Sequence, residues 1–262
     1  MRIHDAIERI LDQMPKRLPA GGCDRVVHGD PQRELHGIAV TFMASRAVLK
    51  RAAAAGADFI VTHEPTWWNH HDHTDWLAGD PVQRDKAAFI DRHGQVLWRL
   101  HDHVHIGWPD LIARGMLQAL GWEAQAVAAR PNIVELPASP LRTVAAHVRA
   151  RLGAAAVRVA GDLDAPVSRL AFLPGACGGR RQLDLLKEPD VDAVFCGESP
   201  EWETCEYVRD AVVQGRSKGL IITGHANSEE AGMAHVADLI RAWFPGVPVV
   251  HLPTGDPFRL VM

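Results

Sequence analysis

Histidines are concentrated in one stretch of this chain, and imidazole nitrogens serve proteins both as metal ligands and as proton carriers. Of the 15 histidines, eight lie between His63 and His105. The segment HDHVH places His101, His103 and His105 at every second position. Because side chains alternate between the two faces of a strand, a strand here would aim all three imidazoles one way. The preceding residues VLWRL are largely apolar, so a metal site or active site is favoured over a solvated edge.

Two further motifs place possible metal ligands directly after predicted strands. His63 ends the apolar strand DFIVTH and Glu64 follows it, and both residue types bind zinc, manganese or iron. A histidine that only caps a turn is the alternative. His225 follows the strand GLIITG, with Glu229 four residues later, so the two can reach one ion. Alternatively, Glu229 only complements a helix dipole.

Three other signals are weaker. Glu198, in FCGESP, is a candidate general base or metal ligand, or else a turn residue. The glycine-rich turn LPGACGG matches neither common nucleotide-binding fingerprint, so a packing turn is favoured over a phosphate cradle. The segment WWNHHDHTDW, with His70, His71 and His73, is typical of a mobile, solvated loop.

Composition excludes several classes of protein. Hydrophobic residues make up 47% and charged residues 23%, as in globular domains. The net charge of -4 and the lack of a long basic run argue against a nucleic-acid partner. No apolar stretch reaches membrane-spanning length, and the N-terminus lacks a signal-peptide pattern, so no membrane partner is expected. The cysteines, Cys23, Cys177, Cys196 and Cys205, form no C-x-x-C pair, which favours reduced thiols and a cytoplasmic location.

Helical and strand patterns alternate along the chain, which predicts an α/β fold. A helix is expected over Ile3–Met14. A strand, a helix capped by Ser45 and a second strand then form a β-α-β unit. The segments GADFIVTHEP, DVDAVFCGESP and GLIITGHANSEE each end a buried strand on polar residues. We therefore predict two related three-layer α/β lobes with a cleft between them. One lobe comprises residues 1–121 and about 220–262, and the other, inserted, comprises about 122–219.

Several segments, in order, resemble the NGG-interacting-factor-three-like family of dinuclear metal centre proteins, often labelled GTP cyclohydrolase type-two-like. They span nearly the whole chain and are VVHGDP, GADFIVTHEPTWW, VDAVFCGESPEWETCEYVRD, GHANSEEAGM and TGDPFRLV. The resemblance implies a two-metal site. On its pattern, His63 is the first ligand, and His225 and Glu229 are the C-terminal pair of ligands.

The chain departs from the family pattern at two positions. Glu64 stands where the family has a second histidine. Counting back from Pro109 puts His101 on a family histidine and His105 on a family aspartate. An alternative alignment uses Asp102, which strand alternation disfavours. The exchange roughly preserves the ligand set, with Glu64 supplying the carboxylate that His105 lacks.

The resemblance and the ligand types together predict a metal-dependent hydrolase of a small, cyclic or nucleotide-like substrate. Two divalent ions, Zn, Mn or Fe, would be held by His63, Glu64, His105, His225 and Glu229. His101 and His103 would carry protons or stabilise an oxyanion, and Glu198 would act as a base. The alternative is a non-enzymatic metal-binding scaffold or regulatory protein. The resemblance also implies a homo-oligomer, typically a hexamer.

Overall fold

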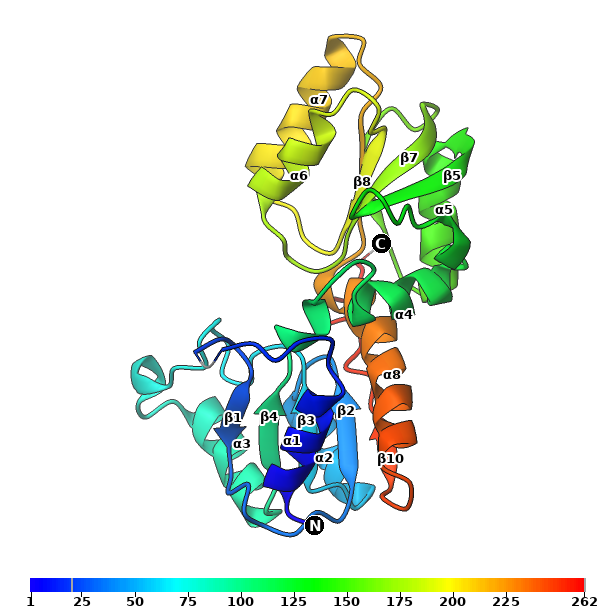
Figure 1. Ribbon diagram of the computed structural model, residues 1–262. Coiled ribbons are helices and arrows are strands. Elements are labelled where there is room, and N and C mark those ends of the chain that lie inside the picture. The colour runs from blue at the N-terminus through cyan, green and yellow to red at the C-terminus, as the bar shows by residue number, and fades with distance from the viewer. Residues whose placement is uncertain (20, 262) are drawn as a thin grey trace. The chain divides into compact units, whose positions relative to one another are not determined.

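The chain is divided into two compact units, each built on its own sheet. The computed structural model describes residues 1–19 and 21–261 (Figure 1). The first unit comprises Met1–Leu111 and Met233–Thr254, and the second comprises Ile112–Gly232 and the residues from Gly255 onward. No helix among the described residues has the length and apolar character needed to cross a bilayer.

The sheet of the first unit has five strands in the spatial order β1-β4-β3-β2-β10. The strands are β1 (Arg25–His28), β2 (Ile38–Thr41), β3 (Phe59–Thr62), β4 (Val96–Arg99) and β10 (Val249–His251). The neighbours β10, β2, β3 and β4 are parallel, whereas β1 runs antiparallel to β4. The carboxyl ends of β2, β3 and β4 therefore meet at one edge, which is where open α/β sheets place their ligands.

Helices cover this sheet on both faces. They are α1 (Ile3–Asp12), α2 (Arg46–Ala54), α3 (Pro81–Arg92) and the C-terminal part of α8 (His225–Trp243). The aligned residues Ala39, Ile60 and Leu97 pack against α2 and α3, while α1 lies over one face of the sheet (Figure 1). As predicted, the Ser45 side chain caps α2 by accepting a hydrogen bond from the Val48 N–H.

The second unit repeats this plan, with five strands in the order β5-β7-β8-β9-β6. The strands are β5 (Ile133–Pro140), β6 (Arg158–Gly161), β7 (Pro166–Leu173), β8 (Ala193–Cys196) and β9 (Gly219–Ile222). The helices are α4 (Leu111–Leu120), α5 (Leu141–Leu152), α6 (Gly179–Leu186) and α7 (Glu206–Val213). Strands β7, β8 and β9 are parallel, and both edge strands are antiparallel to their neighbours. The predicted pair of related α/β lobes is confirmed.

The chain returns to the first unit later than the expected position near residue 220. Strand β9, which begins at Gly219, pairs with β8 and β6 and so belongs to the second sheet. The change of unit falls inside α8, at Met233. No sequence pattern marks this boundary, because it falls inside one continuous helix.

The strand predicted through HDHVH is wrong. Strand β4 ends at Arg99, and His103–His105 form a turn of 3-10 helix. The cause is the Asp24 carboxylate, which accepts hydrogen bonds from the backbone N–H groups of His101, Asp102 and His103 at 2.6, 2.7 and 3.0 Å. These donors are consequently lost to any continuing strand, and the chain turns.

Candidate metal centre

His63 and Glu64 follow β3 at the carboxyl edge of the first sheet, as predicted. The backbone N–H of His63 donates to the carbonyls of Thr41 and Phe42, both at 3.2 Å, and that of Glu64 donates to Phe42 at 2.8 Å. The Thr62 hydroxyl donates to the Glu64 carbonyl. His63 is fully buried and Glu64 is 9% exposed. The sheet edge thus fixes the backbone from which both side chains project.

Three imidazoles come together beside this edge. The ring centroids of His63 and His101 are 4.7 Å apart, those of His63 and His105 are 5.1 Å apart, and those of His101 and His105 are 4.9 Å apart. The Nε2 atoms of His63 and His105 are separated by 3.3 Å. One ring nitrogen from each histidine lies within 4.8 Å of the other two. We call these three residues the histidine cluster.

Each ring of the histidine cluster is oriented by an oxygen acceptor at Nδ1. The Nδ1 of His63 lies 3.2 Å from the Leu100 carbonyl, that of His101 lies 2.9 Å from Asp102, and that of His105 lies 3.0 Å from Asp110. An acceptor at Nδ1 places the proton there and leaves the lone pair on Nε2. This is the arrangement by which proteins orient histidines that bind metals.

Burial, and then the neighbouring His63, lowers the pKa of His101. A lowered pKa keeps this imidazole neutral near pH 7, which is the form that binds a metal. Burial by itself would raise the pKa of Asp102, but hydrogen bonds from the Cys23 N–H and from His101 lower it overall. Asp102 is therefore a carboxylate acceptor for the His101 ring.

Glu64 and the buried Arg99 complete the surroundings of the histidine cluster. Glu64 Oε1 is 4.0 Å from His63 Nε2 and 3.9 Å from His101 Nε2. The Arg99 guanidinium donates to the carbonyls of His63 and His70 and lies 3.9 Å from the carboxylates of Glu64 and Asp72. Arg99 is fully buried. Sequence reasoning missed it, because one arginine within an apolar strand carries no signal of its own.

The structure places His103 apart from the histidine cluster. Its Nδ1 is 2.5 Å from Asp24, and its Nε2 accepts a hydrogen bond from the Leu18 N–H at 3.0 Å. The prediction that it shares a face with His101 and His105 is wrong, because the backbone turns instead of alternating. Its role as a proton carrier stays a prediction, which these two contacts do not favour.

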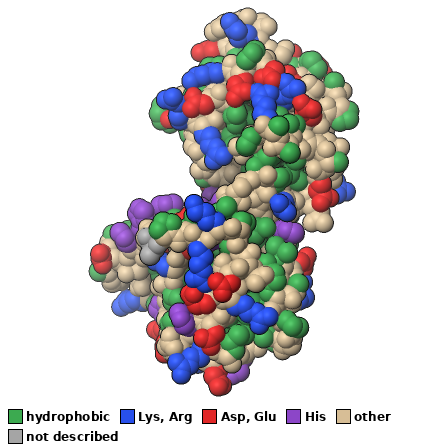
Figure 2. All heavy atoms as spheres, viewed as in Figure 1, with side chains coloured by type: hydrophobic (Ala, Val, Ile, Leu, Met, Phe, Trp, Pro, Cys, Tyr) green, Lys and Arg blue, Asp and Glu red, His purple; other side chains and the backbone are tan. Residues whose placement is uncertain are grey.

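The histidines of the loop between β3 and α3 remain exposed. His70, His71 and His73 all lie at the surface, and Figure 2 shows histidine side chains gathered on the first unit. The loop is nevertheless held by its own hydrogen bonds. The Asn69 side chain bonds both the N–H and the carbonyl of His73, and Asp72 accepts from the Trp67 N–H. The three histidines are exposed to solvent, as predicted. These hydrogen bonds give the loop a defined conformation, which the sequence pattern did not predict.

A second polar group is built in the second unit from residues that follow β8 and β9. The Nδ1 of His225 is 2.9 Å from Glu198, and its Nε2 is 3.2 Å from Glu229, which is 3% exposed. The structure thus brings together the three residues that the sequence singled out in this half. An imidazole held between two carboxylates can bind a cation or carry a proton.

The glycine-rich turn LPGACGG packs against this group. A Cβ on Gly175 would lie 2.3 Å from Glu229 Oε1 and 3.4 Å from His225 Nε2. The Gly175 N–H donates to the Ser228 hydroxyl, which itself donates to the His225 carbonyl. The turn therefore serves as the packing turn that the sequence favoured.

Comparison with known proteins decides the family. The model of the Duf34/NIF3 (NGG1p interacting factor 3) family matches residues 1–257. The chain belongs to the NIF3 family. The resemblance inferred from the ordered motifs is thereby confirmed.

Three proteins of known sequence or structure resemble this NIF3-family chain over 97–100% of its length. A Clostridium perfringens protein named GTP cyclohydrolase 1 type 2 homolog is 24% identical over 274 residues, which cover all of both chains. The crystal structure of a Bacillus cereus protein related to NIF3 matches with a TM-score of 0.78 and 15% identity, covering 100% of this chain and 99% of that one. Reduced HcgD from Methanocaldococcus jannaschii matches with a TM-score of 0.71 and 15% identity, covering 97% of each.

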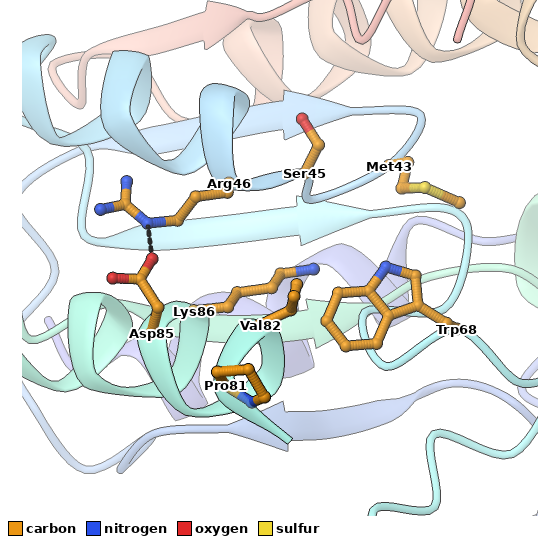
Figure 3. A pocket seen from close by; sticks show the side chains of 8 residues that line it. All are labelled: Met43, Ser45, Arg46, Trp68, Pro81, Val82, Asp85 and Lys86. Atoms are coloured by element: carbon orange, nitrogen blue, oxygen red, sulfur yellow. Dashed lines mark hydrogen bonds and ion pairs between the residues drawn. The ribbon is translucent and has the colours of Figure 1, made fainter. Parts of the chain in front are cut away.

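The first unit of this NIF3-family chain also has a pocket of about 380 Å³ beside α2 and α3 (Figure 3). Its walls combine apolar and aromatic side chains with charged ones, namely Met43, Ser45, Arg46, Trp68, Pro81, Val82, Asp85 and Lys86. Lys86 is 3% exposed, donates to the Thr66 carbonyl at 2.7 Å and lies 5.0 Å from the centre of the Trp68 ring. Burial lowers the pKa of Lys86 to about 8.

Trp68, which lines this pocket, is held in an unfavourable backbone conformation. Its φ of 60° lies in the left-handed region, which bulky residues avoid, and the residue is 43% exposed. Its ring contacts the Trp67 ring, with centroids 6.1 Å apart, and the Lys86 ammonium.

Proposed function

We propose that this protein is a metal-dependent hydrolase of a small, cyclic or nucleotide-like substrate, with its histidine cluster as ligands. The observation that carries the proposal is the 3.3 Å separation of the Nε2 atoms of His63 and His105. Two nitrogens bound to one tetrahedral zinc ion at ~2.0–2.1 Å would be ~3.3 Å apart. Two lone pairs facing each other at this distance repel unless a cation or a proton lies between them.

The donor set fits such an ion. Three imidazoles with their Nδ1 atoms held by oxygen acceptors match catalytic sites that keep one position open. The sequence predicts His101 as a proton carrier, but its position among the three rings supports a ligand role. Imidazole ligands suit Zn and Fe, and the nearby Glu64 carboxylate also suits Mn.

A divalent ion bound here would lower the pKa of a water molecule and polarise the bond to be broken. The sequence predicts Glu64 as a metal ligand, and its carboxylate, 3.9–4.0 Å from two rings of the cluster, is also placed to accept the proton of that water. Arg99 provides a fixed positive charge 3.9 Å from Glu64 and holds the His63 carbonyl. Together they orient the base and limit movement of the ligands.

The prediction that His225 and Glu229 are also metal ligands is carried forward. It is supported by Glu198, which orients the His225 ring at Nδ1, and by the 3.2 Å approach of Nε2 to Glu229. The number of metal ions bound per chain then distinguishes a one-ion from a two-ion site. Glu198 fits the role of orienting residue better than that of a base, because its carboxylate is engaged with the ring.

The pocket bounded by Trp68 and Lys86 supports a substrate with a planar ring and an anionic group. An exposed indole face offers stacking, and Lys86 offers positive charge beside it, whereas the Arg46 guanidinium is paired with Asp85. The Clostridium relative's name makes GTP the first compound to test.

The test is hydrolysis by chelator-treated protein before and after addition of Zn²⁺, Mn²⁺ or Fe²⁺. The substrates are GTP, other nucleoside triphosphates, cyclic nucleotides and a phosphodiester. Turnover should require metal and fall by at least ~100-fold in His63→Ala, as is usual when a catalytic group is lost. His36→Ala, whose ring pairs with Asp58 outside the histidine cluster, should retain activity.

Two other outcomes would contradict the proposal. Stoichiometric metal binding without turnover of any of these substrates would favour the non-enzymatic scaffold. Turnover that persists without metal, or in His63→Ala, would remove the histidine cluster from the mechanism.

A further inference from the structure

A cysteine lies against the outer side of the histidine cluster, held there by the backbone. The Cys23 N–H donates to Asp102 Oδ2 at 2.7 Å. A Cβ at the preceding Gly22 would lie 2.3 Å from the same oxygen, so any larger residue at position 22 would displace the Asp102 carboxylate. The Cys23 sulfur, a ring nitrogen of His101 and a carboxylate oxygen of Asp102 all lie within 4.8 Å of one another.

An exposed histidine contacts the same sulfur. The Nε2 of His70 is 3.6 Å from Cys23 Sγ. A thiolate and an imidazole bound to one tetrahedral zinc ion would be ~3.5 Å apart. The backbone carbonyl of His70 is fixed by Arg99 at 2.6 Å, so the loop presents this ring at a set position.

The atoms that meet at Cys23 select a class of cation. Sulfur with imidazole nitrogen prefers borderline or soft ions such as Zn²⁺ and Co²⁺, whereas Mg²⁺ and Ca²⁺ prefer oxygen ligands. None of the roles assigned above to the histidine cluster uses Cys23 or His70. The exposed rings of His71 and His73 extend the same surface. The ring centroids of His70 and His71 are 4.8 Å apart, and those of His71 and His73 are 5.6 Å apart.

We propose that Cys23, His70 and Asp102 form a capture site for a borderline divalent cation, from which the ion passes to the histidine cluster through His101. His101 belongs to both groups of possible ligands. Exposure falls along this route, from His70 at the surface to His101, whose side chain is 25% exposed, and to the fully buried His63. An ion moving inward would thus keep one imidazole ligand while it exchanges the others.

The test uses the full chain, freed of metal and then titrated with Co²⁺. A thiolate bound to Co²⁺ gives a charge-transfer absorption in the near ultraviolet that imidazole ligands do not give. The band should be present in the wild type, absent in Cys23→Ser and retained in Cys205→Ser, the matched control at a half-buried cysteine of the second unit. It should also persist in His63→Ala, so this inference does not depend on the proposed hydrolase.

The loading role is tested by the rate of Zn²⁺ uptake, followed by competition with a coloured chelator. Cys23→Ser should load several-fold more slowly than the wild type and reach the same zinc content in the histidine cluster. A wild type without the charge-transfer band, or a band unchanged in Cys23→Ser, would overturn the capture site. Equal loading rates in the two proteins would overturn the transfer.

Discussion

Asp110 contacts a ring nitrogen of His105, the proposed ligand that stands where the family pattern has an aspartate. Its carboxylate lies 3.0 Å from His105 Nδ1. Where the family pattern has an aspartate, this chain has an imidazole, and the carboxylate is found five residues further on. A carboxylate is thus retained near the site, but it contacts the His105 ring instead of binding a metal directly.

Asp110→Ala should therefore weaken metal binding without abolishing it. Loss of a carboxylate that orients a ligating histidine typically costs ~10- to 100-fold in affinity. Competition against a chelator of known affinity measures the change. Asp91→Ala is the control, because Asp91 pairs with His28 outside the histidine cluster. Unaltered affinity in Asp110→Ala would show that His105 needs no such partner.

Lys86 makes stability depend on pH in a predictable direction. Burial lowers its folded-state pKa to about 8 from 10.5, and the nearby Asp72 only partly opposes this. The unfolded chain binds the extra proton between these values, so stability should rise as pH increases from about 8 to about 10.5. Burying the charged form costs roughly 3 kcal/mol at neutral pH.

Lys86→Met keeps the length of the side chain and removes its charge. The rise in unfolding free energy with alkaline pH should consequently be smaller in the variant by up to roughly 3 kcal/mol. Urea unfolding of both proteins at neutral pH and near pH 10 gives this difference, in which the other titrating groups cancel. Parallel curves would mean that the Lys86 ammonium is well solvated.

At the scale of elements, the alternation of strands and helices was enough to predict both sheets and the residues that follow β3, β8 and β9. It failed at HDHVH because the acceptor that turns the chain, Asp24, lies 77 positions from His101 in the sequence. Local patterns carry no information about such a partner. For the same reason His103 was expected on the face of His101 and His105, whereas its ring contacts Asp24 and the Leu18 N–H instead.

Two glycines of the LPGACGG turn allow the effect of backbone conformation on stability to be measured apart from the effect of a clash with neighbouring side chains. Gly175 and Gly178 both have positive φ, 76° and 83°, but a Cβ meets Glu229 only at Gly175 and nothing within 4 Å at Gly178. Gly178, with ψ of 151°, lies in a region that only glycine adopts readily, so Gly178→Ala should lose ~1–3 kcal/mol through the backbone alone. Gly175→Ala should also disturb His225, visible as a shifted imidazole signal in NMR spectra that Gly178→Ala does not produce. An unshifted His225 signal in Gly175→Ala would argue against the packing role.

At the scale of the whole molecule, each unit ends its parallel strands on a group of imidazoles and carboxylates. This repetition follows from the topology, because parallel strands of an open sheet deliver their carboxyl ends to one edge. The homo-oligomer implied by the family remains a prediction. Light scattering on the purified protein should give a multiple of the 28.7 kDa chain mass, and a monomer at micromolar concentration would contradict it.

The central claim is that the histidine cluster binds a divalent metal, and calorimetric titration of chelator-treated protein with Zn²⁺ tests it most directly. The wild type should take up at least one tightly bound equivalent per chain. That equivalent should be missing in His63→Ala and present in His36→Ala. A wild type that binds no zinc, or a His63→Ala variant that binds it equally well, would contradict the account.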